Sequence, residues 1–185
     1  MEKFNFLILG GSQGAKSFST LLPEEIGRLP KELKDRLQIR QQCCAGQEEE
    51  VLKAYKKLGI MRVEVAAFFK NMAEQYAFSH LVVARSGAST LAEMMLFGRP
   101  GILIPYPYAA DNHQWHNARF LTQKSAAWMV EEKDISKKMF STLLESLILD
   151  PEALMNRASQ MSSLATKQED QELADLIEKH SIFEG

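Results

Sequence analysis

The sequence predicts a doubly wound α/β domain, with a mainly parallel six-stranded sheet, helices on both faces and a C-terminal helical tail. Short β-rich runs alternate with amphipathic stretches of helical period, as in strand–helix–strand units. The runs FLIL, LVVA and GILI are apolar throughout, as expected for strands buried on both faces. With 185 residues, no internal repeat and no low-complexity linker, the chain is expected to form one domain over residues 1–185.

Six strands are expected, one at each β-rich run. They cover residues 4–9, 37–43, 62–66, 81–84, 101–104 and, with the weakest pattern, 127–130. The stretches between them predict helices over residues 15–28, 48–58, 72–78, 91–97 and 113–124, and closing helices over 136–149, 152–164 and 171–179. Because such sheets bind ligands beyond the carboxyl ends of their strands, the loops that follow the strands are expected to carry function.

Composition excludes several classes of protein. The chain has 22 Lys and Arg against 24 Asp and Glu, and no dense basic patch indicates nucleic-acid binding. No apolar run approaches the ~18 residues of a membrane span, and the first residues lack the apolar core of a signal peptide. The adjacent Cys43 and Cys44 suit neither a disulfide scaffold nor a zinc site. These features favour a cytoplasmic protein.

The loop GGSQGAKSF, residues 10–18, leads from the first strand into a helix. Ala15 separates Gly14 from Lys16, so the lysine is out of register for a P-loop, and the glycine spacing does not fit G-x-G-x-x-G. Both motifs share a physical basis, because glycines allow close approach and the N–H groups that open a helix attract anions. With Ser12 as a further donor, the loop is either an anion site or a plain strand-to-helix turn.

The loop after the third strand, AAFFKNM, places Phe68 and Phe69 before a polar break. An aromatic edge is suited to flank a flat base, while neighbouring backbone N–H and C=O groups read the polar edge of that base. The alternative is that at least one of the two is an ordinary core phenylalanine.

The loop after the fourth strand, ARSGASTLAE, crowds a cation, small residues and hydroxyls at a helix N-terminus, which favours an anion. Glu93 lies one turn after Thr90 and is suited to accept hydrogen bonds from a ribose diol. The alternative is a capping box, in which Thr90 caps the helix and Glu93 reaches back to it. A cap does not explain Arg85, because an arginine at the end of a buried strand needs an anionic partner.

The loop after the fifth strand, IPYPYAADNHQWHNA, opens a helix with more polar groups than capping requires. His113, Gln114 and Asn117 supply imidazole and amide groups suited to the hydroxyls of a sugar. His113 and His116 lack Cys or Glu partners, so they are weak evidence for a metal, and no metal site is expected. A base edge, a ribose carboxylate, a diphosphate cradle and a reader of hydroxyls together describe a nucleotide-sugar site.

The motifs GGSQGA, RSGASTLAE followed by GRPGILIPYP, and DNHQWHNA closely resemble the C-terminal half of the MurG family, from about residue 4 to about residue 180. These bacterial transferases move N-acetylglucosamine (GlcNAc) from UDP-GlcNAc onto lipid-linked muramoyl-pentapeptide. The resemblance implies the Rossmann-like C-terminal domain of a GT-B glycosyltransferase, which binds the donor. It assigns the diphosphate to Ser12 in the loop with Gly14, the uracil to backbone groups of Phe69, phosphate to Arg85, Ser89 and Thr90, the ribose to Glu93, and the GlcNAc to His113, Gln114 and Asn117.

The N-terminal acceptor half of that family has no counterpart in this sequence. The chain is therefore expected to be either an excised donor domain or the donor subunit of a split UDP-GlcNAc transferase, and to be inactive without its partner. An unrelated nicotinamide oxidoreductase is a third hypothesis, which the absent G-x-G-x-x-G disfavours. The resemblance also implies a role in peptidoglycan synthesis, cell shape and cell division. It implies a full-length protein peripheral on the cytoplasmic face of the plasma membrane, and it implies no cofactor.

Overall fold

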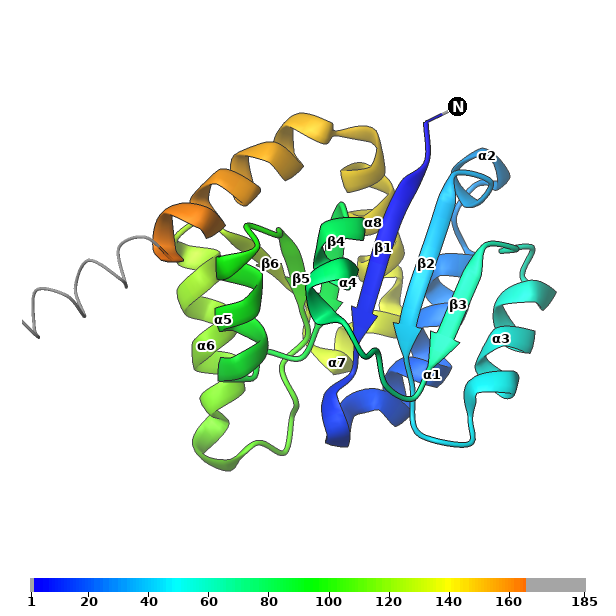
Figure 1. Cartoon of the computed structure of the whole chain (residues 1–185), viewed down its shortest axis with the longest axis horizontal. Helices are drawn as coiled ribbons and strands as arrows, with labels where there is room; N and C mark the ends of the chain where they lie inside the picture. The colour runs from blue at the N-terminus through cyan, green and yellow to red at the C-terminus, as the bar shows by residue number, and fades with distance from the viewer. Residues whose placement is uncertain (1, 166–185) are drawn as a thin grey trace, which may run out of the picture.

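The computed structural model describes residues 2–165, apart from the side chains of residues 12–15. Its centre is a six-stranded sheet in the order β3-β2-β1-β4-β5-β6, with every neighbouring pair parallel (Figure 1). The strands are β1 (Phe4–Leu9), β2 (Leu37–Gln42), β3 (Val63–Ala66), β4 (Leu81–Ala84), β5 (Gly101–Leu103) and β6 (Ala127–Met129). All six predicted strands are confirmed. The strand order reverses between β1 and β4, the position at which such sheets bind ligands.

Helices cover both faces of the sheet (Figure 1). The longer helices are α1 (Gly11–Gly27), α3 (Glu48–Lys57), α4 (Met72–Phe78), α5 (Ala88–Leu96), α6 (His113–Gln123) and α8 (Phe140–Leu149). Short turns of helix lie at α2 (Lys31–Lys34), η1 (Ala110–Asn112), α7 (Glu132–Asp134) and η2 (Ile135–Met139). A last described helix covers residues 151–165 and runs across the amino-terminal end of the sheet. The helix predicted over residues 171–179 lies outside the described residues.

Two hydrophobic cores flank the sheet, and β1 contributes to both. Phe6 and Ile8 pack with α1, α3 and α8 on one face, whereas Leu7 and Leu9 pack with α4, α5 and α6 on the other. Alternate residues of a strand point to opposite faces, so a strand buried on both sides must be apolar throughout. The run FLIL is therefore typical of a central strand. No helix in residues 2–165 is long and apolar enough to cross a membrane.

Three predicted helix starts are wrong. The closing helix predicted from residue 136 begins at Phe140, because η2 before it contains Lys137 and Lys138 outside helical φ/ψ. The other two are those of helices that follow the central strands. α1 begins at Gly11 rather than residue 15, and α5 begins at Ala88 rather than residue 91. The first turn of each helix consists of small and polar residues that leave no apolar periodicity to read. Tertiary context decided these starts.

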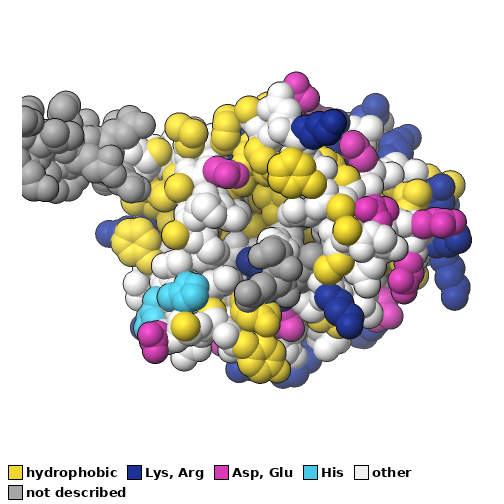
Figure 2. Space-filling view, turned by 60° about the horizontal axis from the view of Figure 1, so that its bottom comes forward, with side chains coloured by type: hydrophobic (Ala, Val, Ile, Leu, Met, Phe, Trp, Pro, Cys, Tyr) yellow, Lys and Arg dark blue, Asp and Glu magenta, His cyan; other side chains and the backbone are white. Residues whose placement is uncertain are grey.

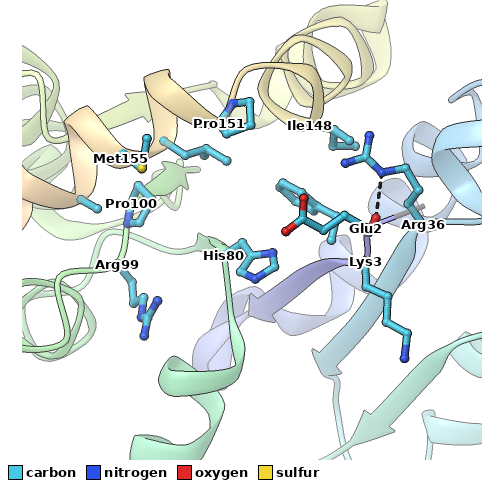
Figure 3. A pocket seen from close by; sticks show the side chains of 12 residues that line it. Glu2, Lys3, Arg36, His80, Arg99, Pro100, Ile148, Pro151 and Met155 are labelled. Carbon is cyan, nitrogen blue, oxygen red and sulfur yellow. Dashed lines mark hydrogen bonds between the residues drawn. The ribbon is translucent and has the colours of Figure 1, made fainter.

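A hollow of about 370 Å³ lies at the amino-terminal end of the sheet, opposite the loops of interest (Figure 3). Phe4 and Ile148 are among the residues that line it, together with charged side chains such as Arg36, and His80 faces it. The Asn5 backbone N–H donates to Nδ1 of His80 over 3.2 Å. Burial and the nearby Arg99 lower the pKa of His80 below its ordinary 6.5, and Glu2 opposes this only in part.

This geometry predicts a pH dependence of stability. Because the pKa of His80 is lower in the folded than in the unfolded chain, the unfolded chain takes up the proton first as pH falls. Stability is therefore full above pH ~6.5 and decreases as pH falls through that value. Because His80 is partly exposed, solvent screening keeps this loss small. His80→Asn, whose amide oxygen replaces the acceptor, should flatten the urea-unfolding profile between pH 7 and 5.5. Equal profiles for both proteins would contradict this role.

Candidate nucleotide-sugar site

The candidate site lies at the carboxyl ends of β1 and β4 (the lower edge of the sheet in Figure 1). Leu9 and Ala84, the last residues of these two strands, are register partners. α1 begins two residues after Leu9, and α5 begins four residues after Ala84. Two helix N-termini therefore open at adjacent strand ends, where both dipoles favour an anion. Figure 2 shows this end of the molecule, with hydrophobic side chains beside scattered charged ones.

The glycine loop forms the start of α1. Gly10 is the N-cap, and Gly11 has a φ of +63°, a conformation that favours glycine. Ser12 and Gly14 belong to the first turn of α1, and the side chain of Ser12 lies outside the described part of the chain. The first backbone N–H groups of a helix have no acceptor within it, so this turn presents donors at the carboxyl end of the sheet.

The start of α5 supplies a second set of donors. Gly87 is the N-cap, and the first helical bond runs from Leu91 N–H to Gly87 C=O over 3.1 Å. The N–H groups of Ala88, Ser89 and Thr90 precede that bond and have no acceptor within the helix. Ser89 is exposed, so a ligand can reach this turn.

The capping box considered for α5 is wrong. Thr90 is the third residue of the helix and Glu93 the sixth, so neither stands at the cap. The Glu93 side chain, which is half-buried, lies beside the hydroxyl of Tyr76. Burial raises the pKa of Tyr76, and the Glu93 carboxylate raises it further. The ribose role of Glu93 stays a prediction, and the Tyr76 hydroxyl is a partner that its carboxylate already has within the chain.

The two phenylalanines after β3 have different environments. Phe69 is 5% exposed and belongs to the core under α4 and α5, whereas Phe68 is 70% exposed. The interpretation that at least one is a core residue is therefore confirmed. Asn71 follows them and caps α4 by accepting from the Glu74 N–H. A role of Phe69 toward a base would have to use its backbone, because its ring is buried.

The polar residues that open α6 are tied to neighbouring loops. Gln114 Oε1 accepts from the Tyr106 N–H over 3.0 Å, and its backbone C=O accepts from Ser86 Oγ over 2.7 Å. Asn117 Nδ2 donates to the Ser86 C=O over 3.0 Å. His113 is exposed, and its Nδ1 lies 2.7 Å from the Ala110 C=O. These bonds bring the β4–α5 and β5–α6 loops together, so the start of α6 lies beside the start of α5.

Arg85 has an anionic partner within the chain. Its guanidinium is almost fully buried and forms an ion pair with Glu132 of α7 through Nη2. Nη2 also donates to Ser17 Oγ over 2.8 Å, and Nη1 donates to the carbonyls of Ile104 and Pro105 over 3.1 and 3.2 Å. The phosphate contact of Arg85 was predicted because a buried arginine needs an anionic partner. Glu132 is such a partner within the chain. Sequence reasoning missed Glu132, and nothing in its surroundings, VEEKD, distinguishes it from a surface carboxylate.

The chain matches the model of the glycosyltransferase family 28 C-terminal domain over residues 5–177. The chain belongs to this family. The resemblance to the MurG family is confirmed by curated relatives named UDP-N-acetylglucosamine--N-acetylmuramyl-(pentapeptide) pyrophosphoryl-undecaprenol N-acetylglucosamine transferase. The relative from Bartonella bacilliformis is 40% identical over 177 residues, 96% of this chain and 46% of that protein. The relative from Caulobacter vibrioides is 42% identical over 173 residues, 94% of this chain and 48% of that protein.

Solved structures agree with this membership. The crystal structure of Acinetobacter baumannii MurG superposes with a TM-score of 0.83 at 29% identity, covering 96% of this chain and 52% of that one. The predicted fold class, a Rossmann-like C-terminal domain of the GT-B type, is thus confirmed. This family 28 domain spans about half the length of the relatives that it matches.

Proposed function

We propose that this family 28 domain binds UDP-GlcNAc as the donor half of a transferase that moves GlcNAc onto lipid-linked muramoyl-pentapeptide in peptidoglycan synthesis. The observation that carries the proposal is the pair of helix N-termini, α1 and α5, at the adjacent ends of β1 and β4. Two sets of N–H donors side by side suit a diphosphate. The names of the relatives supply the rest of the donor and the acceptor.

The neighbouring groups extend this placement to the whole donor. The diphosphate would lie against Ser12 and Gly14 in α1 and against Ser89 and Thr90 in α5. Backbone groups at Phe69 would read the uracil, and the Glu93 carboxylate would accept from the ribose diol. The start of α6, with His113, Gln114 and Asn117, would face the sugar hydroxyls. No metal or cofactor takes part in this proposal.

The setting that we propose for the whole protein is the one that the resemblance to the MurG family implies. The donor domain would work with an acceptor domain, joined to it or supplied as a separate chain, at the cytoplasmic face of the plasma membrane as a peripheral protein. Such a protein would serve cell shape and cell division through wall synthesis. The alternative is a free-standing nucleotide-sugar subunit of a split transferase. The two differ in whether the gene encodes an acceptor domain before residue 1.

Titration calorimetry on the purified chain tests donor binding. UDP and UDP-GlcNAc are expected to bind, whereas NAD is not, because the first turn of α1 lacks the dinucleotide glycine spacing. UMP is the matched comparison and should bind more weakly than UDP, because it lacks the second phosphate for the helix N-termini. NAD binding tighter than UDP would overturn the proposal.

A further inference from the structure

The Arg85–Glu132 pair joins four segments that are distant in sequence. Arg85 directly follows β4, and Glu132 begins α7. Ser17 of α1 bonds to both, since its Oγ accepts from Arg85 Nη2 and donates to Glu132 Oε2 over 3.0 Å. The guanidinium also lies over the ring of Phe18, 4.5 Å from the centroid. The side chains of Arg85 and Glu132 are only 6% and 24% exposed, so the pair is largely shielded from water. A charged pair with this burial, whose guanidinium also donates to Ser17 and to two backbone carbonyls, holds its neighbours in one arrangement.

The fourth segment is the β5–α6 loop, residues 104–112. Arg85 binds its first two carbonyls, those of Ile104 and Pro105. The far end of the loop contains Asp111 and Asn112 with φ of 48° and 52°, two successive residues in the left-handed region. Such a backbone persists only where surrounding contacts hold it. The pair with Arg85 holds the start of the loop, and α6 holds its end.

The loop connects the pair to the groups proposed to face the sugar. Tyr106 directly follows the two bound carbonyls, its ring lies 5.4 Å from the Arg85 guanidinium, and its N–H donates to Gln114. The Gln114 C=O accepts from Ser86, whose own C=O accepts from Asn117. A shift of Ile104 would therefore move Tyr106 and, with it, the side chain of Gln114. Errors of about 1 Å at such positions are costly for a bound ligand.

We propose that Glu132, acting through Arg85, is a positioning residue that orients the β5–α6 loop and the start of α6 toward the sugar of the donor. This inference rests on the proposed function and deepens it. Arg85 would then act within the protein framework rather than on the diphosphate. The two roles predict opposite changes in UDP affinity when Glu132 is replaced. If Arg85 acted on the diphosphate, loss of the competing carboxylate would free it to bind a phosphate and UDP would bind more tightly.

The test measures the Kd of UDP and UDP-GlcNAc for wild type, Glu132→Ala and Glu132→Gln by titration calorimetry. The positioning role predicts that Glu132→Ala weakens UDP-GlcNAc roughly tenfold more than UDP, which lacks the sugar. Glu132→Gln keeps the size and one acceptor oxygen, so its loss should be smaller. Tighter UDP binding by Glu132→Ala, or equal losses for both ligands, would overturn the positioning role.

Two controls keep the outcome interpretable. Glu131→Ala, which removes a half-buried carboxylate that pairs with Lys133 at 2.7 Å, should leave both Kd values unchanged. Hydrogen exchange needs no ligand, and Glu132→Ala should speed exchange at the amides of residues 106–112 more than in the strands. Unchanged exchange there would contradict the positioning role, whereas absence of UDP-GlcNAc binding by wild type would reject the proposed function alone. If Glu132→Ala fails to fold, Glu132→Gln carries both measurements.

Discussion

The purified 185-residue chain is expected to bind UDP-GlcNAc and to transfer essentially no GlcNAc to a lipid-linked acceptor. We expect it to stabilise the leaving UDP, because negative charge that develops there would meet the N–H donors that open α1 and α5. Transfer also needs a base within hydrogen-bond reach of the attacking hydroxyl, and such a base contributes roughly 10²–10⁴-fold. It further needs a site closed to water. The chain spans about half of its relatives, and we expect the other half to supply both.

The assay follows radiolabelled GlcNAc into the lipid fraction, first with the chain alone and then with an acceptor domain fused or added in trans. Addition of the acceptor domain is expected to restore transfer. Robust transfer by the chain alone would contradict the prediction and would indicate a base within this domain. His113 would be the first candidate, because a proton on Nδ1, bonded to Ala110, leaves Nε2 as an acceptor. His113→Ala would then abolish that activity.

Glu93→Ala is expected to weaken UDP by about 10- to 100-fold, as loss of a charged hydrogen bond of roughly 1.5–3 kcal/mol implies. The carboxylate is half-buried on α5, one turn beyond the helix start proposed to hold the diphosphate. Glu93→Gln, which keeps one acceptor oxygen, should lose less. The affinity for uridine should fall by the same factor as the affinity for UDP, because both ligands carry the ribose.

A second ligand sharpens this test. Wild type should bind 2′-deoxy-UDP more weakly than UDP, whereas Glu93→Ala should no longer distinguish the two. Glu152→Gln, an exposed carboxylate on the helix over residues 151–165, is the control and should change neither affinity. The melting temperature should change little in Glu93→Gln, because Glu93 is not part of a cap. Unchanged UDP affinity in both Glu93 variants would reject the ribose role.

Much of the fold was predictable from the sequence, because the relevant information is local. A strand that is buried on both faces must be apolar at every position, so FLIL, LVVA and GILI marked β1, β4 and β5. The alternation of such runs with helical patterns determined a parallel sheet with helices on both faces. It also placed the informative loops at the carboxyl ends of the strands.

Other features were decided only by tertiary structure, because they depend on which strands become neighbours. The order β1-β4-β5-β6 brings the loops after these strands together, and so places Glu132 beside Arg85 across 47 residues of sequence. A contact between residues so far apart in the sequence leaves no periodic pattern from which it could be predicted. The starts of α1 and α5 were decided in the same way, since glycines and small polar residues allow several local conformations and packing selects one. The sequence therefore determined which residues gather at this edge of the sheet, whereas the tertiary contacts decided that the buried arginine pairs with a carboxylate of its own chain.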